Sequence, residues 1–219
     1  KLFHPFLGNE VVDGVGIQHH ENYYGLVKRW VERSSKAGKK WIVAIDEPMG
    51  AKYGLRTDAE RPEHDTARCQ VLWPCLFAGG AGVDWYYGWQ NNSPTSDLAS
   101  ENFRDRENMW KQTKVALDFF NENLPFYEMK PANELLADTV NALVLAKENE
   151  LYAIYWRKFD ETALDLSKAD KEEFKVKWFN PKTGGELLDG TVQIVKGGQK
   201  VNVGLPPAGV QPDWVCLLR

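Results

Sequence analysis

The chain has 219 residues, of which 26% are charged and 43% hydrophobic, and its formal net charge at pH 7 is −4. This balance is typical of a soluble globular protein and is too apolar for a disordered one. The length is sufficient for one large domain or two smaller ones. Because the basic residues are scattered and form no stripe, we expect neither a nucleic-acid partner nor a membrane partner.

From the N-terminus to about residue 123, strand-like runs alternate with helix-like ones. The strands are expected at 12–18, 41–45 and 82–87, and the helices at 22–37, 65–78 and 103–122. Pro74 should kink the second helix, because proline has no backbone N–H and clashes with the preceding turn. Three consecutive βα units predict parallel strands with right-handed crossovers. At this level a barrel and a doubly wound sheet remain equally compatible with the pattern.

Beyond a linker around Pro131 the pattern changes to short strands separated by Gly- and Asn-rich turns. The expected strands are 142–146, 150–156, 162–166, 174–180, 191–195, 200–203 and 213–218. Phe174, Val176 and Trp178 alternate with lysines, as in a half-buried antiparallel strand. Seven short strands without a helix predict a small β-sandwich of about 85 residues.

Cysteine and histidine spacing gives no metal site. The sequence has no CxxC or HxxxH pattern, and adjacent residues of the run His19-His20-Glu21 point in opposite directions in an extended chain. Cys69 and Cys75 lie on different faces of one expected helix, and Cys216 belongs to the second domain. We therefore expect three buried free thiols, no metal and no cofactor.

The residues best placed for chemistry follow the strand Trp41–Ile45, which runs directly into Asp46-Glu47-Pro48. An acid at the carboxyl end of a parallel strand is where barrel enzymes place catalytic groups, because the loops that follow the strands form the active-site face. From spacing alone, Asp46 or Glu47 could equally be a salt-bridging acid in a surface loop.

Several blocks spread over nearly the whole chain carry a family resemblance. They are Trp41–Glu47, Leu72-Trp73, Ala78–Gly88, Phe103–Arg106, Trp110–Thr113, Phe119-Phe120, Leu124–Phe126, Trp178–Gly184, Pro206-Pro207 and Asp213–Val215. The blocks up to Phe126 resemble bacterial apiosidase-like glycoside hydrolases, which are retaining (β/α)₈ barrels. The later blocks resemble the C-terminal module that such proteins carry under the name "putative collagen-binding domain".

The resemblance implies that the chain holds the last three βα units of a TIM-type (β/α)₈ barrel followed by a small antiparallel β-sandwich. Residues 1–130 would then supply barrel strands six to eight, and residues 131–219 an accessory domain. Glu47 matches the position of the nucleophile, at the end of the seventh strand. The acid/base ends the fourth strand and would lie upstream of Lys1, so we expect the chain to be inactive without the N-terminal part of the same barrel. A secreted or periplasmic bacterial protein with a carbohydrate substrate is expected.

Four more residues are expected in the substrate site. Gln18 and His19 end the strand before the one that carries Glu47, and either side chain could hydrogen-bond sugar hydroxyls or the nucleophile. A strand-end polar pair in solvent is the competing interpretation. Trp85 and Tyr87 alternate onto one face of the last strand and could form a sugar platform, or could simply pack in the core.

The remaining polar residues near Glu47 are given structural roles. In an extended strand Asp46 should point away from Glu47, towards the helices or the neighbouring loop. Arg56, Asp58 and Asp65 follow in a long polar loop and are interpreted as surface charges, outside the site.

Two other functions remain as alternatives. The chain could be a glycan- or matrix-binding or structural module without catalysis, in which the first domain is only a scaffold. A nucleotide-binding α/β protein is disfavoured because no Gly-rich phosphate loop follows a strand.

Overall fold

The structure is a computed structural model that describes residues 2–19, 21–50, 52, 54–88, 102–137, 141–207 and 213–219. The chain divides into two compact units, Lys1–Thr113 (unit 1) and Lys114–Arg219 (unit 2). Each of the two has its own hydrophobic core. The long helix α3 (Glu107–Asn123) crosses the boundary between them.

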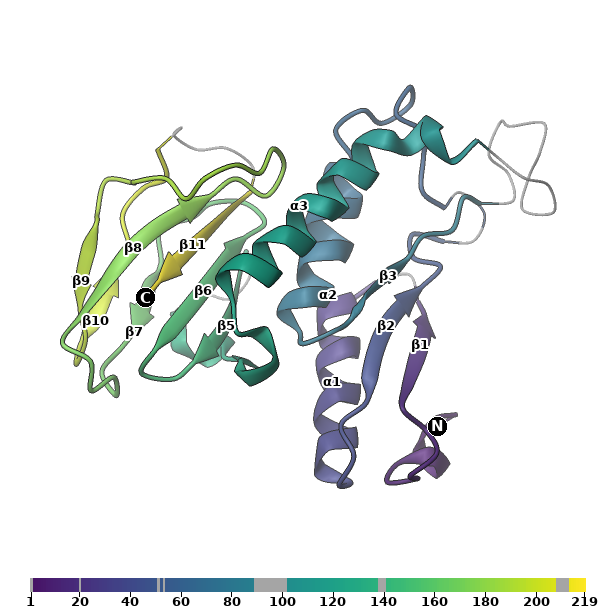
Figure 1. Cartoon of the computed structure of the whole chain (residues 1–219), viewed down its shortest axis with the longest axis horizontal. Coiled ribbons are helices and arrows are strands. Elements are labelled where there is room, and N and C mark those ends of the chain that lie inside the picture. The colour runs from purple at the N-terminus through teal and green to yellow at the C-terminus, as the bar shows by residue number, and fades with distance from the viewer. Residues whose placement is uncertain are drawn as a thin grey trace. The chain divides into compact units, whose positions relative to one another are not determined.

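Unit 1 is built on a three-stranded parallel sheet of order β1-β2-β3 (Figure 1). Its elements in chain order are η1 (His4–Phe6), β1 (Gly14–Gln18), α1 (Tyr23–Lys36), β2 (Ile42–Asp46), η2 (Ala67–Leu72), α2 (Trp73–Phe77), β3 (Gly82–Asp84), η3 (Phe103–Arg106) and the first turns of α3. In register, Gln18 lies beside Asp46, and Asp46 lies beside Asp84. The three strands therefore bring their carboxyl ends to one edge of the sheet.

Helices cover one face of this sheet. Val27 and Val31 of α1 are buried one turn apart and pack with Val43 and Ile45 of β2 in a single cluster. The 3.6-residue period of α1 places these apolar side chains on one stripe, and that stripe is the face it buries. The Asn22 side chain accepts a hydrogen bond from the Gly25 N–H (3.2 Å) and caps the start of the helix.

The expected kink at Pro74 takes a different form. Residues Ala67–Leu72 form π-helical turns, in which the Trp73 N–H donates to the Arg68 carbonyl five residues earlier. An α-helix follows over Trp73–Phe77, with Pro74 in its first turn. A wider turn before the proline relieves the clash of its ring with the carbonyl four residues back, so the helix changes its winding at this point.

The expectation of a TIM-type (β/α)₈ barrel is wrong. Over the described residues the fold is β-rich with three α-helices and mostly small sheets, and the sheet of unit 1 stops at three strands with β1 and β3 as its edges. The alternation of strand and helix does give parallel pairing. It does not determine whether a sheet closes, since closure depends on strand number, tilt and stagger.

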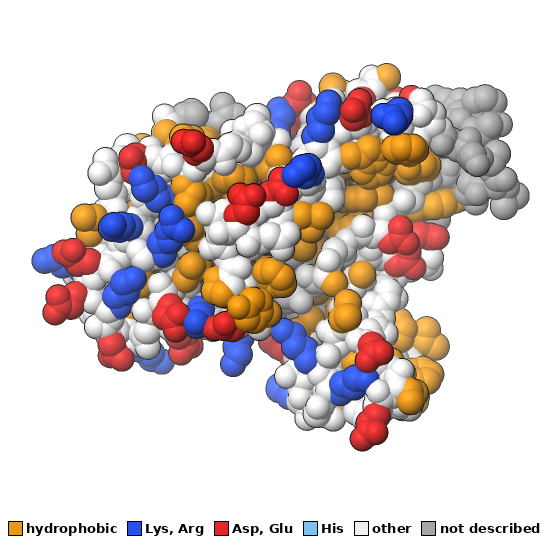
Figure 2. Space-filling view, in the orientation of Figure 1, with side chains coloured by type: hydrophobic (Ala, Val, Ile, Leu, Met, Phe, Trp, Pro, Cys, Tyr) orange, Lys and Arg blue, Asp and Glu red, His pale blue; other side chains and the backbone are white. Residues whose placement is uncertain are grey.

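Unit 2 is almost entirely antiparallel. Its elements after α3 are η4 (Phe126–Glu128), β4 (Lys130–Pro131), η5 (Asn133–Leu135), β5 (Ala142–Lys147), β6 (Leu151–Trp156), β7 (Ala163–Asp165), β8 (Glu173–Phe179), β9 (Ile194–Lys196), β10 (Lys200–Asn202) and β11 (Trp214–Leu218). Six strands form one sheet in the order β4-β5-β6-β11-β8-β9, and β10 pairs with β7 in a second. On the face of unit 2 that Figure 2 shows, acidic and basic side chains are interspersed.

The core of unit 2 fills the space between its two sheets. Every second side chain along the strands of the large sheet points to this space and packs in one cluster with Leu164 of β7 and Val201 of β10. Trp156 and Trp178 stack at its centre, with ring centroids 5.4 Å apart. The opposite face of the large sheet is also buried. On this face the ring centroids of Phe119 of α3 and Phe179 of β8 are 4.5 Å apart. The central strands β6 and β11 are therefore buried on both faces.

The three cysteines are free and buried, as predicted. Burial raises the pKa of Cys75 to about 12, although the carbonyl of Gly82, 3.2 Å from the sulfur, and a backbone hydrogen bond to Ile45 oppose the shift. Burial also raises the pKa of Cys216 well above its ordinary value. Across the described ranges no helix has both the length and the apolarity needed to span a bilayer.

Candidate functional site

Three polar side chains form a row at the carboxyl end of the parallel sheet. Ile17 and Ile45 are buried against the helices, so their neighbours in the strands face the other way. Gln18, Asp46 and Asp84 are in register across the sheet and lie on this opposite side. We call the side of the sheet away from α1 the open face.

The expected direction of Asp46 is wrong. A Cβ added to Gly16 would lie 3.4 Å from the Asp46 Cβ and 3.7 Å from its Oδ2, so the carboxylate lies over Gly16 on the open face. Asp46 keeps the alternation of the strand, since its neighbour Ile45 faces the helices, and it is Glu47 that departs from this alternation. Glu47 leaves the strand with φ 47°, in the left-handed region, and the alternation of side chains ends there.

Glu47 is fixed by contacts from both neighbouring strands. Its N–H donates to the Asp84 carbonyl (3.2 Å), and its Oε2 accepts a hydrogen bond from Gln18 Nε2 (2.7 Å). The residue is half-buried. Left-handed backbone at a residue other than glycine costs about 1–3 kcal/mol and is concentrated at functional sites. The structure therefore brings together Gln18 and Glu47, two of the residues expected in the site.

The turn after Glu47 is anchored to α1. The Met49 N–H donates to the hydroxyl of Tyr23 (2.9 Å), and Met49 has φ 71°, so two of three consecutive residues are left-handed. Burial raises the pKa of Tyr23, and the hydrogen bond from Met49 partly offsets that rise. The hydroxyl therefore stays protonated at neutral pH and keeps its place in the turn.

The other three residues expected in the substrate site make contacts of their own. His19 is exposed, and its Nδ1 lies 3.3 Å from the Glu21 nitrogen in the turn after β1. Trp85 is partly buried and packs against the core of unit 1 on the helix side. Tyr87 is half-buried beneath the guanidinium of Arg106, which lies 4.0 Å from the centre of its ring.

A second group of residues was not expected in the site. The segment 54–66, the 54–66 loop, is irregular up to His64 and enters a helix at Asp65 and Thr66, and charged groups that are themselves buried hold it in place. Arg106 is fully buried and its Nε donates to the Leu55 carbonyl (2.7 Å). The Leu55 N–H donates to the Tyr86 carbonyl (2.7 Å), so the loop begins beside the segment that follows β3.

The far end of the 54–66 loop is held by two more buried side chains. His64 is 4% exposed, has φ 46°, and its Nε2 lies 2.7 Å from Asp58 Oδ1. Arg68 is fully buried and donates to the Glu63 carbonyl (2.9 Å) and to Asp65 Oδ1 (2.6 Å). A buried guanidinium is tolerated only when its donors are satisfied, so these bonds specify one loop conformation.

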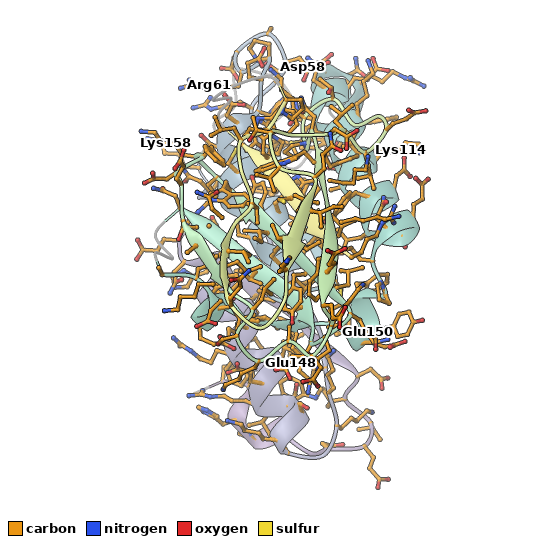
Figure 3. The ribbon with its side chains drawn as sticks, turned by 90° about the vertical axis from the view of Figure 1, so that its left-hand side faces the viewer. Asp58, Arg61, Lys114, Glu148, Glu150 and Lys158 are labelled. Atoms are coloured by element: carbon orange, nitrogen blue, oxygen red, sulfur yellow. The ribbon has the colours of Figure 1, made fainter. Side chains whose placement is uncertain are left out.

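A cavity of about 510 Å³ opens between Met49 and the 54–66 loop. Figure 3 labels Asp58 and Arg61, which both belong to this loop. The interpretation of Arg56, Asp58 and Asp65 as surface charges did not anticipate the contacts that Asp58 and Asp65 make. Loop length was the available signal, since an irregular segment longer than about 12–15 residues in a compact domain is usually functional or disordered. Among the described residues no cluster of His, Cys, Asp and Glu could hold a metal ion.

Comparison with known proteins gives a match in two parts. Residues 131–219 match the family model described as "Putative collagen-binding domain of a collagenase". A solved structure titled "Glycoside hydrolase" is similar over 96% of this chain and 53% of its own, with a TM-score of 0.62 and 17% identity. In fold, the chain resembles half of a glycoside hydrolase.

A second solved structure supports this similarity. It is a glycoside hydrolase family 5 protein from Bacteroides vulgatus ATCC 8482, with a TM-score of 0.66 and 17% identity over 96% of this chain and 51% of that one. The chain thus spans about half the length of both structures. No curated protein matches it significantly. The comparisons therefore show a fold similar to half of two glycoside hydrolases, and a match of residues 131–219 to the model of a putative collagen-binding domain.

Proposed function

We propose that this chain is the part of a retaining glycoside hydrolase that carries the nucleophile, Glu47. The observation that supports this most directly is the hydrogen bond from Gln18 to Glu47 Oε2, at the end of β2, with the backbone of Glu47 held in a left-handed conformation. A nucleophile must be ionised and held in one rotamer close to the anomeric carbon. Gln18 donates to one carboxylate oxygen, and Oε1 is then the oxygen that attacks.

The chemistry follows from these roles. Glu47 Oε1 forms a bond to the anomeric carbon while the glycosidic C–O bond breaks, and the leaving oxygen takes a proton from a second carboxylic acid. Water, deprotonated by that second group, then releases the sugar from the glycosyl ester. The two carboxyl groups lie about 5–5.5 Å apart in retaining enzymes. By the family resemblance, the acid/base comes from a segment of the parent protein N-terminal to Lys1, and the chain is inactive without it.

The first prediction concerns Glu47→Gln in the full-length parent protein. The amide keeps the shape of the side chain and cannot act as the nucleophile, so kcat on a glycoside substrate should fall on the order of 10⁴-fold or more. The melting temperature should change little, because the residue is half-buried and loses no volume. Turnover is measured on a panel of plant and algal oligosaccharides, with the fold checked by circular dichroism.

Glu21→Gln is the matched control, since Glu21 is exposed at the same end of the sheet, in the turn after β1. It should keep wild-type turnover. A 2-deoxy-2-fluoro glycoside should trap the glycosyl ester, and mass spectrometry should find the added sugar on the peptide that contains Glu47. Wild-type turnover by Glu47→Gln, or a trapped sugar on another residue, would show that the nucleophile assignment is wrong.

A second candidate function, binding to a fibrous matrix protein, is favoured by the family match of residues 131–219. If this domain binds collagen, the chain should sediment with native collagen fibrils and be left in solution by heat-denatured collagen. Glu47→Gln should not alter this binding, because Glu47 belongs to unit 1. If the same fraction of the chain is found in the pellet with collagen fibrils and without collagen, this function is excluded.

A further inference from the structure

We infer that the cavity beside the 54–66 loop is a preformed binding subsite for an uncharged sugar residue, with Arg61 as a principal hydrogen-bond donor. The assignment of a sugar rests on the proposed function. Binding at this cavity can nevertheless be measured without turnover.

The position of the cavity links it to the candidate nucleophile. Met49 contributes to its wall, two residues after Glu47, and the Tyr23 hydroxyl fixes the backbone of Met49. The loop that forms the rest of the wall begins at Gly54 and Leu55, against the segment that follows β3. A ligand in the cavity would therefore lie at the end of the sheet that carries Glu47. Its volume of about 510 Å³ is within the range of small-molecule sites, about 300–1,000 Å³.

Hydrogen bonds hold the wall of the cavity to the rest of unit 1 without any ligand. Asp58 accepts hydrogen bonds on both oxygens, from His64 at 2.7 Å and from the Asn108 N–H at 3.0 Å. Gln112 accepts from Arg68 (2.7 Å) and donates to the Glu63 carbonyl (3.1 Å). These bonds tie the loop to the first turns of α3. Preorganisation of this kind lowers the entropy cost of binding, which a loop used only as a connector does not need.

The lining is suited to hydroxyl groups. A hydroxyl both donates and accepts, so it pairs with guanidinium donors and carboxylate acceptors alike. Arg56 and Arg61 face the cavity together with the acids Glu60, Glu63 and Asp65. The Arg61 side chain makes no hydrogen bond or ion pair with any residue that the structure describes. It can therefore bind a ligand without first breaking a contact.

The same charges select against charged ligands. Asp65 is neutralised by the buried Arg68, which leaves two acids and two arginines facing the cavity. The attraction of an anionic sugar to the two arginines would be offset by its repulsion from the two acids. Its charge would still have to lose its hydration on binding, which costs free energy. Met49, Leu55 and Pro62 add apolar surface to the lining, against which the carbon face of a sugar ring can pack. The balance favours a neutral ring.

The test uses the chain with Glu47→Gln, so that no turnover occurs, and isothermal titration with neutral trisaccharides (xylotriose, cellotriose and arabinotriose). Trigalacturonate is the anionic arm and a chitosan trimer is the cationic one. We expect saturable binding of at least one neutral trisaccharide with Kd of about 1 mM or tighter. Arg61→Ala should weaken it about tenfold, the loss expected for a hydrogen bond from a charged donor.

Two further variants make the outcome decisive. Thr66→Phe places a ring in the cavity and should abolish binding, whereas Arg29→Ala, an exposed arginine on α1, should have no effect. The inference is overturned if no neutral trisaccharide binds, if a charged trisaccharide binds more tightly, or if Arg61→Ala and Thr66→Phe leave binding unchanged. If the cavity binds sugar and Glu47→Gln in the parent protein keeps full turnover, the nucleophile proposal fails while the subsite stands.

Discussion

Single residues of the Glu47 turn show how a strained backbone is held in place. Glu47 and Met49 both have positive φ, and each such residue costs about 1–3 kcal/mol. Two hydrogen bonds from backbone N–H groups, Glu47 to the Asp84 carbonyl and Met49 to the Tyr23 hydroxyl, offset part of this, since each contributes about 1 kcal/mol net. The strain is what turns the Glu47 side chain to the side of Gln18. A relaxed strand would have continued the alternation set by Asp46.

Cys75 leads to a prediction at the same scale. Its folded pKa is raised from 9.0 to about 12 by burial, whereas in the unfolded chain the thiol titrates near its ordinary value. The folded state therefore binds the proton more tightly. The stabilisation of the folded state that comes from keeping Cys75 protonated is fully present below pH 9. It is lost as the pH rises from 9 towards 12, by up to about 1.4 kcal/mol of unfolding free energy per pH unit.

Cys75→Ala should remove this dependence. At about pH 7.5 the variant should be less stable than the wild type, because it leaves a small cavity, and at about pH 10.5 the difference should shrink by about 2 kcal/mol. Urea denaturation of both proteins at the two pH values measures the difference. A gap in unfolding free energy that stays constant between them would contradict the prediction.

At the scale of elements, local pattern predicted much of what the structure contains. The apolar run 41–45 and the turn signals of the tail place β2 and β5 to β11 within a few residues of their observed bounds. The two-residue strand β4 was missed, because two residues carry no periodicity. The barrel was wrong for a different reason. Each βα unit has the same local pattern in an open sheet and in a closed one.

The candidate site was predictable to the same extent. Strand ends of a parallel sheet meet at one edge, which correctly placed Gln18 beside Glu47. The direction of Glu47 depended on its left-handed φ, and the conformation of the 54–66 loop depended on Arg106 and Gln112, which lie far along the chain. Such contacts between distant segments leave no periodic signal in the sequence. They appear only when the fold is known.

At the scale of the whole molecule, the two units differ in how their sheets are protected. In unit 2 the strands β6 and β11 are central in a six-stranded sheet and buried on both faces. In unit 1 the sheet has three short strands, and its open face leaves Ile42 64% exposed and Gln18 exposed. Local stability follows buried apolar contact and protected hydrogen bonds, so it should be unequal between the units.

Hydrogen exchange should detect this inequality in the intact chain. We expect the ladder amides of β6 and β11 to exchange at least about tenfold more slowly than those of β1 and β3, which corresponds to about 1.4 kcal/mol of opening free energy. The central strand β2 is an internal control. It is bonded on both sides, and Val43 and Ile45 are fully buried, so its protection should lie between the two groups.

Protection of β1 and β3 equal to that of β6 would contradict the prediction. It would mean that some element covers the open face, either from the same chain or from a second copy of it. Mass spectrometry at two protein concentrations separates these outcomes, because protection that comes from association between copies rises with concentration, whereas protection within one chain does not.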